Sequence, residues 1–243
     1  SLFLKFPLAL SVLRSIINYG ERQEHDLLTL YIQRGMDMKK QKYFQLTQDA
    51  VNKLAENYGT PLLVLSLEQI EKNYNFIREQ LPQVKIHYAM KANPDLRILE
   101  TLAEMGSCFD VASDGEIRTL AELGISGDRL IYANPIKTGT GLKACNDSGV
   151  YRMTFDSEAE IKKIAATCPG ATVLLRLRID NAKAHVDLNK KFGAPADKAL
   201  DLLKAAKEAG LDAAGIAFHV GSQTVLADPY LEALDLVRRI YEE

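Results

Sequence analysis

Cysteine and histidine are scarce in this sequence of 243 residues, which contains three cysteines and four histidines. Cys108, Cys145 and Cys168 lie far apart, without the short spacings of metal-ligating or redox pairs, and their odd number argues against a disulfide framework. The histidines form no HxxxH or HExxH pair that would hold a metal ion. We therefore predict no metal site and a reducing, cytoplasmic location.

The sequence also lacks an excess of charge of either sign. Its formal net charge is -2 at pH 7, so nothing draws it to nucleic acid or to an anionic membrane surface. The apolar stretch from Leu2 to Ile17 is interrupted by charged residues and a proline, so we expect no transmembrane helix there. With 47% apolar and 26% charged residues, the composition is typical of a globular protein.

The amino-terminal residues differ from the rest of the chain. Ser1 is not a natural start, whereas Met36 and Met38 open a lysine-rich run that is typical of a soluble amino terminus. We expect residues 1–37 to be a non-native or disordered leader. Residues 38–243 are expected to form one α/β domain.

Short apolar runs recur along this domain. A helix is predicted after Thr47, then a buried strand over residues 62–67 and a helix opening at Glu68. Six further runs follow, with helix-like stretches between most of them: 86–91, 108–113, 130–135, 152–156, 172–179 and 215–222.

Regular alternation of strands and helices indicates a parallel sheet, either a (β/α)8 barrel or a doubly wound sheet. GxGxxG and P-loop lysine motifs are absent, which disfavours a nucleotide-binding doubly wound sheet. We therefore predict a TIM-type barrel. Because six strands do not close an eight-stranded barrel, we expect a barrel truncated after about six strands.

Lys91 stands at the end of the first of these six runs. Strand periodicity places His87, Ala89 and Lys91 on one face, and Asn93-Pro94 then breaks the strand. The lysine is thus expected at the carboxyl-end rim, where α/β proteins bind their ligands. A desolvated lysine there can lose its proton and attack a carbonyl in Schiff-base chemistry, although a solvated lysine is the commoner case.

Other polar residues follow the later runs and should rise to the same rim. Taken singly, most have ordinary explanations as helix caps or turn residues. His219 differs because its run is so apolar that a buried ring would need a partner. The residues concerned are Asp110, Ser113, Asn134, Asp156, Arg176, His219 and Ser222.

Several motifs carry a family resemblance over about residues 43–243. HYAMKANP, GSCFDVASDGEI, LIYANPIK, MTFDSEAEI, VDLNKKFGA and GIAFHVGSQ resemble segments of the fold-type III pyridoxal-phosphate decarboxylases, specifically the ornithine/lysine branch. Diaminopimelate decarboxylases share the lysine strand and a segment like HVGSQ, but YANPxK followed by MTFDS looks more like the ornithine/lysine branch. That family folds as an α/β barrel followed by a β domain and forms homodimers.

The resemblance implies a role for five residues. Lys91 matches the lysine that carries pyridoxal 5'-phosphate, and His219 matches the histidine stacked on its ring. Asp110 and Arg176 match polar groups that line the cofactor site, and Ser222 matches a phosphate ligand. Lys191 matches a lysine near the family's dimer interface, so we regard it as structural.

The family's glycine-rich phosphate loop, its EPG segment and its cysteine-aspartate pair have no counterpart in residues 1–243. We therefore expect an amino-terminal part that is inactive alone. The resemblance implies a whole protein that decarboxylates ornithine, lysine or both to a diamine in polyamine biosynthesis. The alternatives are a non-catalytic binding homologue like the antizyme inhibitors, an enzyme like diaminopimelate decarboxylase, and an amino-acid racemase, which the YANPIK and KKFGA segments disfavour.

Overall fold

The structure is a computed structural model, and it describes residues 17–18, 44–179, 191–221 and 228–242. Within these residues the chain forms a sheet in the order β1-β7-β6-β5-β4-β3-β2. Six strands are mutually parallel: β2 (His87–Ala89), β3 (Cys108–Val111), β4 (Leu130–Tyr132), β5 (Arg152–Phe155), β6 (Thr172–Leu177) and β7 (Asp212–Phe218). The predicted barrel-like arrangement of six parallel strands is confirmed.

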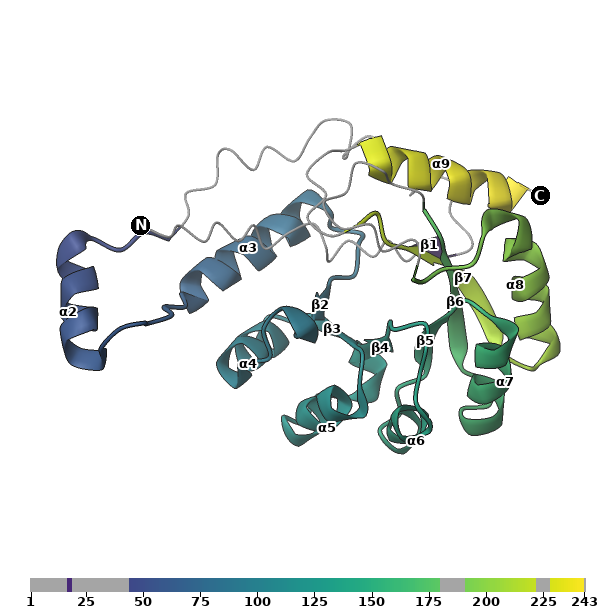
Figure 1. Cartoon of the computed structure of the whole chain (residues 1–243), viewed down its shortest axis with the longest axis horizontal. Helices are drawn as coiled ribbons and strands as arrows, with labels where there is room; N and C mark the ends of the chain where they lie inside the picture. The colour runs from purple at the N-terminus through teal and green to yellow at the C-terminus, as the bar shows by residue number, and fades with distance from the viewer. Residues whose placement is uncertain (1–16, 19–43, 180–190, 222–227, 243) are drawn as a thin grey trace.

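Helices alternate with these strands and lie on the outer side of the arc that the strands form (Figure 1). Several helices begin at a side-chain cap that the sequence supplies: the hydroxyl oxygens of Thr47, Ser66, Ser113 and Thr138 each accept a backbone N–H three residues on. The helices are α2 (Gln48–Tyr58), α3 (Leu67–Gln80), α4 (Leu96–Glu104), α5 (Asp114–Glu122), α6 (Gly139–Asp147), α7 (Glu158–Thr167), α8 (Ala199–Glu208) and α9 (Asp228–Glu242), with short 3-10 turns at Met90–Ala92, Gly127–Arg129 and Ala196–Lys198.

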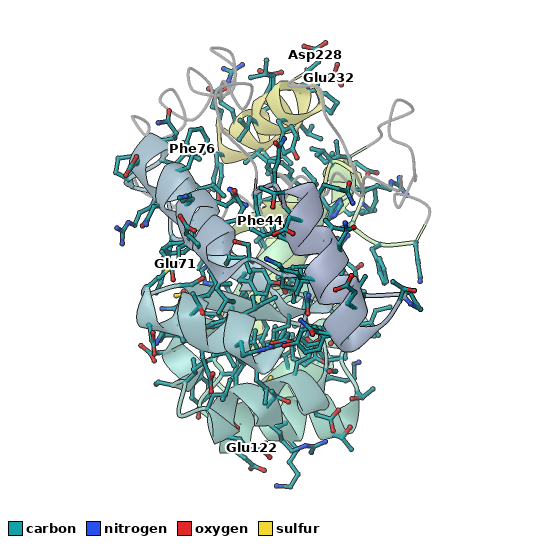
Figure 2. All side chains as sticks on the ribbon, turned by 90° about the vertical axis from the view of Figure 1, so that its left-hand side faces the viewer. Phe44, Glu71, Phe76, Glu122, Asp228 and Glu232 are labelled. Atoms are coloured by element: carbon teal, nitrogen blue, oxygen red, sulfur yellow. The ribbon has the colours of Figure 1, made fainter. Side chains whose placement is uncertain are left out.

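α9 follows β7, and its buried residues, among them Tyr230, Leu234 and Val237, belong to the same main core as those of the outer helices. Figure 2 places its residues Asp228 and Glu232 at the end of the molecule opposite to Glu122 of α5. In Figure 1 the same helix lies at the upper right, above β7 and α8. Among the described residues, no helix is both long and apolar enough to cross a membrane.

The two faces of the sheet carry different side chains. Large residues such as Phe109, Tyr132 and Phe155 point outward into the main core against the helices. The opposite face holds a small cluster of Ile131, Ala133, Leu174 and Ala217. We call this second surface the inner face, because it faces away from α4 to α8.

The strand predicted over residues 62–67 is wrong. Residues 59–66 form no regular structure, and Leu67 already belongs to α3. Leu63 is 75% exposed, and the segment runs between α2 and α3 away from the sheet (Figure 1). An apolar run becomes a strand only where a neighbouring strand can pair with its backbone, and no described strand lies beside this one.

One edge of the parallel sheet is paired with residues from the expected leader. Ile17 and Asn18 form β1 (Ile17–Asn18), which runs antiparallel to β7 at Ile216 and Gly215. β2 lies at the other edge of the described sheet. The remainder of the expected leader, residues 1–16 and 19–37, lies outside the described residues.

Lys137 joins β4 to β5, which share a single registered pair, Tyr132 with Met153. Its side chain is fully buried, and its ammonium donates to the carbonyl oxygens of Asn134 (3.0 Å) and Thr154 (2.5 Å). The same ammonium lies 3.2 Å from a carboxylate oxygen of the buried Glu160. Burial lowers the pKa of Lys137, and the charge of Glu160 opposes that shift. A buried cation thus ties together the ends of two strands that pair weakly.

Candidate functional site

Lys91 lies at the carboxyl end of β2, as predicted, but in a 3-10 turn and not in the strand. β2 ends at Ala89 because the chain turns through Met90–Ala92. The carbonyl of Asn93 accepts a hydrogen bond from the Tyr88 hydroxyl (3.1 Å), and the Asp95 carboxylate caps α4. The Lys91 side chain is exposed, so the described residues do not supply the burial that the sequence suggested.

Asp110 and Arg176 are buried on the inner face of the sheet. Residues paired in register on parallel strands share a face. Asp110 pairs with Ile131, and Arg176 pairs with Ala217, and both partners belong to the inner cluster. Asp110 is 9% exposed and Arg176 is 8% exposed. The strand pairing therefore places both residues on the inner face, which adds to the prediction that they rise to one rim.

Glu116 is a member of this group that the sequence reasoning missed. It lies in the first turn of α5, and its carboxylate accepts the N–H of Ala112 at 2.6 Å. Burial raises its pKa, the negative charge of Asp110 raises it further, and the positive charge of Lys91 lowers it. The pairing of Ala89 with Asp110 and the bond from Ala112 to Glu116 bring both carboxylates and the turn of Lys91 to the same end of β2 and β3. The signal was present, because glutamate three residues after a serine cap is a common helix start.

His219 follows β7 directly and is partly buried. Its Nδ1 accepts the backbone N–H of Gly221 at 2.9 Å. A ring nitrogen that accepts a hydrogen bond carries no proton, so the neutral ring bears its proton on Nε2. The partner expected for this histidine is thus a backbone amide two residues away.

The remaining residues predicted at the rim make local contacts or lie outside the described residues. The Ser113 hydroxyl caps α5, and the Asn134 side chain accepts the N–H of Ile136 (3.3 Å) in a local turn. The Asn134 contact matches the turn that the sequence suggested. Asp156 caps no helix and accepts the N–H of Gly193 at 2.9 Å. Ser222 lies outside the described residues.

The family of this chain follows from its match to a family model. Residues 67–243 match the model of the pyridoxal-dependent decarboxylases, pyridoxal binding domain, which is more than half of the chain. The chain belongs to this family. The matched range contains the strands β2 to β7 and the residues Lys91, Asp110, Arg176 and His219. The sequence-based resemblance and the expected cofactor, pyridoxal phosphate, are confirmed at the level of the domain.

Relatives and solved structures agree with this assignment. The chain is 54% identical over 202 residues to a lysine/ornithine decarboxylase of Selenomonas ruminantium, covering 83% of the chain and 51% of that protein. It is 38% identical to antizyme inhibitor 2 of Xenopus laevis, covering 71% of the chain and 38% of that protein. A crystal structure of lysine decarboxylase from Selenomonas ruminantium superposes with a TM-score of 0.78 at 54% identity, covering 83% of this chain and 53% of that one. The chain spans about half the length of these two decarboxylases and less of the antizyme inhibitor.

The described residues fit a pyridoxal-phosphate site. The chemistry of the donor set is suitable: a primary amine, buried carboxylate and guanidinium groups, and a flat imidazole lie at or near the carboxyl ends of β2, β3, β6 and β7. An amine can attach an aldehyde, and a flat side chain can cover a flat ring. The phosphate ligand expected at Ser222 lies outside the described residues.

Proposed function

We propose that the whole protein is a pyridoxal-phosphate-dependent decarboxylase that acts on ornithine, lysine or both and releases a diamine for polyamine biosynthesis. One observation supports the proposal: residues 67–243 match the pyridoxal-binding domain, and within that range Lys91 follows β2 while Asp110 lies on the neighbouring strand β3. The 54% identity to a lysine/ornithine decarboxylase supports the substrate class.

Each residue has a proposed task. Lys91 attaches the cofactor through its amine, and the carboxylates of Asp110 and Glu116 stabilise positive charge beside it. His219 covers the ring, and Arg176 and Ser222 line the site. When bound, the cofactor supplies an electron sink for the electron pair left as the substrate carboxylate departs as carbon dioxide.

Glu116 also offers a place for a proton. Because burial and Asp110 both raise its pKa, its carboxyl group holds a proton more readily than an ordinary surface glutamate does. When Lys91 loses its charge, the opposing effect on the Glu116 pKa is removed, so proton uptake by Glu116 becomes easier. Glu116 can therefore take up a proton as Lys91 gives one away.

The finer assignments are also proposals. We place the whole protein in a reducing cytoplasm because all three cysteines are free and buried. We propose a homodimer and a small-molecule amino-acid substrate by analogy with the family. We also propose a barrel domain over residues 38–243, preceded by a leader of which Ile17 and Asn18 pair with β7. The choice between ornithine and lysine rests on one methylene, which is worth about 1 to 3 kcal/mol of discrimination.

The test compares two lysines that flank β2, Lys85 and Lys91, in the whole protein. Lys91→Ala should abolish both the absorbance of lysine-bound pyridoxal phosphate and carbon dioxide release, because both depend on the same nitrogen. Lys85→Ala, an exposed residue before the other end of β2, should keep both. Full activity in Lys91→Ala would refute the assignment. Wild-type protein that neither binds the cofactor nor releases carbon dioxide from either amino acid would favour a binding homologue related to antizyme inhibitor 2.

A further inference from the structure

A short segment, residues 191–195, lies beside the carboxyl end of β6 and takes over from β5 there. β5 pairs with β6 only as far as Phe155 with Leu175. Beyond that point Ala194 donates its N–H to the carbonyl of Arg176 (2.8 Å) and accepts the N–H of Arg178 (2.9 Å). Ala194 and Leu177 form an isolated parallel bridge. The segment thus continues the sheet next to Arg176.

Gly193 and Asp156 hold this segment in place. Asp156 follows β5 directly, and its carboxylate accepts the Gly193 N–H at 2.9 Å across 37 positions of sequence. Gly193 has φ +99°, and a Cβ added there would lie 2.8 Å from the backbone nitrogen of Arg178. Only glycine permits this conformation and this close approach to β6. The Asp156 carboxylate therefore acts as the clamp at the end of the segment.

Phe192 uses this anchorage to contact Arg176. The Arg176 guanidinium carbon lies 5.1 Å from the centre of the Phe192 ring. A cation within about 6 Å of an aromatic face is attracted to it, and more strongly when desolvated, as Arg176 is at 8% exposure. A flat guanidinium held against a ring has its plane fixed, which also fixes the direction of its N–H groups.

We propose that Phe192 is a positioning residue for Arg176, and that Asp156, through Gly193, holds Phe192 in position. The consequence rests on the proposed function: the ring sets the direction in which the Arg176 guanidinium presents its N–H groups to the cofactor site. In the structure Phe192 makes its contact with Arg176. Its effect on cofactor binding is therefore indirect.

The first experiment measures cofactor affinity in the whole protein. The ammonium of Lys191 also lies 5.3 Å from the centre of the Phe192 ring. Phe192→Leu, which keeps an apolar side chain but removes the ring, should raise the Kd for pyridoxal phosphate, by at most about 30-fold, which corresponds to the whole free energy of one desolvated cation–π contact. Phe192→Tyr, which keeps the ring, should bind within about twofold of wild type. Asp156→Ala should weaken binding, and Asp156→Asn should weaken it less, because the amide oxygen can still accept the Gly193 N–H.

A matched control separates positioning from general destabilisation. Tyr74 on α3 makes a similar contact with Arg78, at 5.9 Å from the ring centre. Tyr74→Leu should lower the unfolding midpoint of the protein and leave the cofactor Kd unchanged. A Phe192→Leu protein that binds as tightly as wild type, or a Phe192→Tyr protein as weak as Phe192→Leu, overturns the proposal.

A second experiment does not depend on the proposed function. A double-mutant cycle of Phe192→Leu and Arg176→Met, in which each substitution removes one partner of the contact, tests the contact itself by urea unfolding without cofactor. Non-additive unfolding free energies support the contact, and additive ones refute it. If the cycle shows coupling and wild-type protein binds no pyridoxal phosphate, the proposed function fails while the contact between Phe192 and Arg176 stands.

Discussion

Replacing His87 should make the protein resistant to mild acid. The ring is buried on β2, its Nδ1 lies 3.2 Å from the carbonyl oxygen of Lys85, and its Nε2 has no hydrogen-bond partner among the described residues. Since a carbonyl only accepts, the proton of the neutral ring lies on Nδ1. Protonating Nε2 would place a charge in a buried position with positive neighbours, Lys85 and Arg152.

The magnitude follows from the pKa. Burial first, and then the charges of Lys85 and Arg152, lower the pKa of His87 from 6.5 to about 4, against the backbone hydrogen bond to Lys85, which raises it. Between these two values the unfolded chain binds a proton that the folded protein does not, so stability falls as the pH falls from 6.5 to about 4. A gap of this size corresponds to about 3 kcal/mol over the whole window.

Urea unfolding of wild type, His87→Phe and His87→Gln at pH 7 and pH 4.5 measures the effect. Groups other than His87 titrate equally in all three proteins, so their contributions cancel in the differences. We expect wild type to lose about 2 kcal/mol more than either variant between the two pH values. His87→Phe should also gain stability at pH 7, because it removes a buried unsatisfied nitrogen, whereas His87→Gln should not. An equal pH dependence in all three proteins would refute the reasoning.

Two further pairs of substitutions test the packing of the domain by unfolding free energy. Lys137→Met should cost about 3 kcal/mol, because it leaves the buried Glu160 with one partner fewer. Lys163→Met should cost less than about 1 kcal/mol, because the Lys163 side chain is 43% exposed. Equal costs for the two substitutions would contradict the buried network. Gly127→Ala should cost about 1 to 3 kcal/mol, because the new Cβ would lie 2.1 Å from a backbone oxygen. Gly115→Ala in α5 should gain about 0.5 to 1 kcal/mol, because its Cβ meets nothing closer than 3.8 Å. An unchanged stability in Gly127→Ala would show that the backbone at Gly127 is not tightly packed.

Interactions between near neighbours could be predicted from the sequence. The end of β2 near Lys91, the cap at Ser113 and the alternation of strands and helices depend on residues at most a few positions apart. Their signals are spacing and residue type, which the sequence displays directly. The same periodicity placed Asp110 and Arg176 at the same rim, since parallel strands end at a common edge.

An apolar sequence pattern alone could not decide whether a neighbouring strand is present to pair with the segment. Residues 62–67 have the composition of a buried strand, yet Leu63 is exposed and no described strand pairs with it. The exposure of Lys91 has a similar origin, because burial depends on what packs above the turn and not on the turn itself. Burial belongs to the surroundings of a residue, which the local pattern does not contain.

The sequence by itself determined the repeated strand and helix units, their caps and the rim to which Lys91 belongs. Only the tertiary structure decided that Glu116 lies near Lys91 and Asp110, that Lys137 is buried against Thr154, and that Asp156 holds Gly193. The physical reason is distance along the chain. The last two contacts join residues 17 and 37 positions apart, and they form only once the strands have paired in one register and brought separate ends of the sheet together.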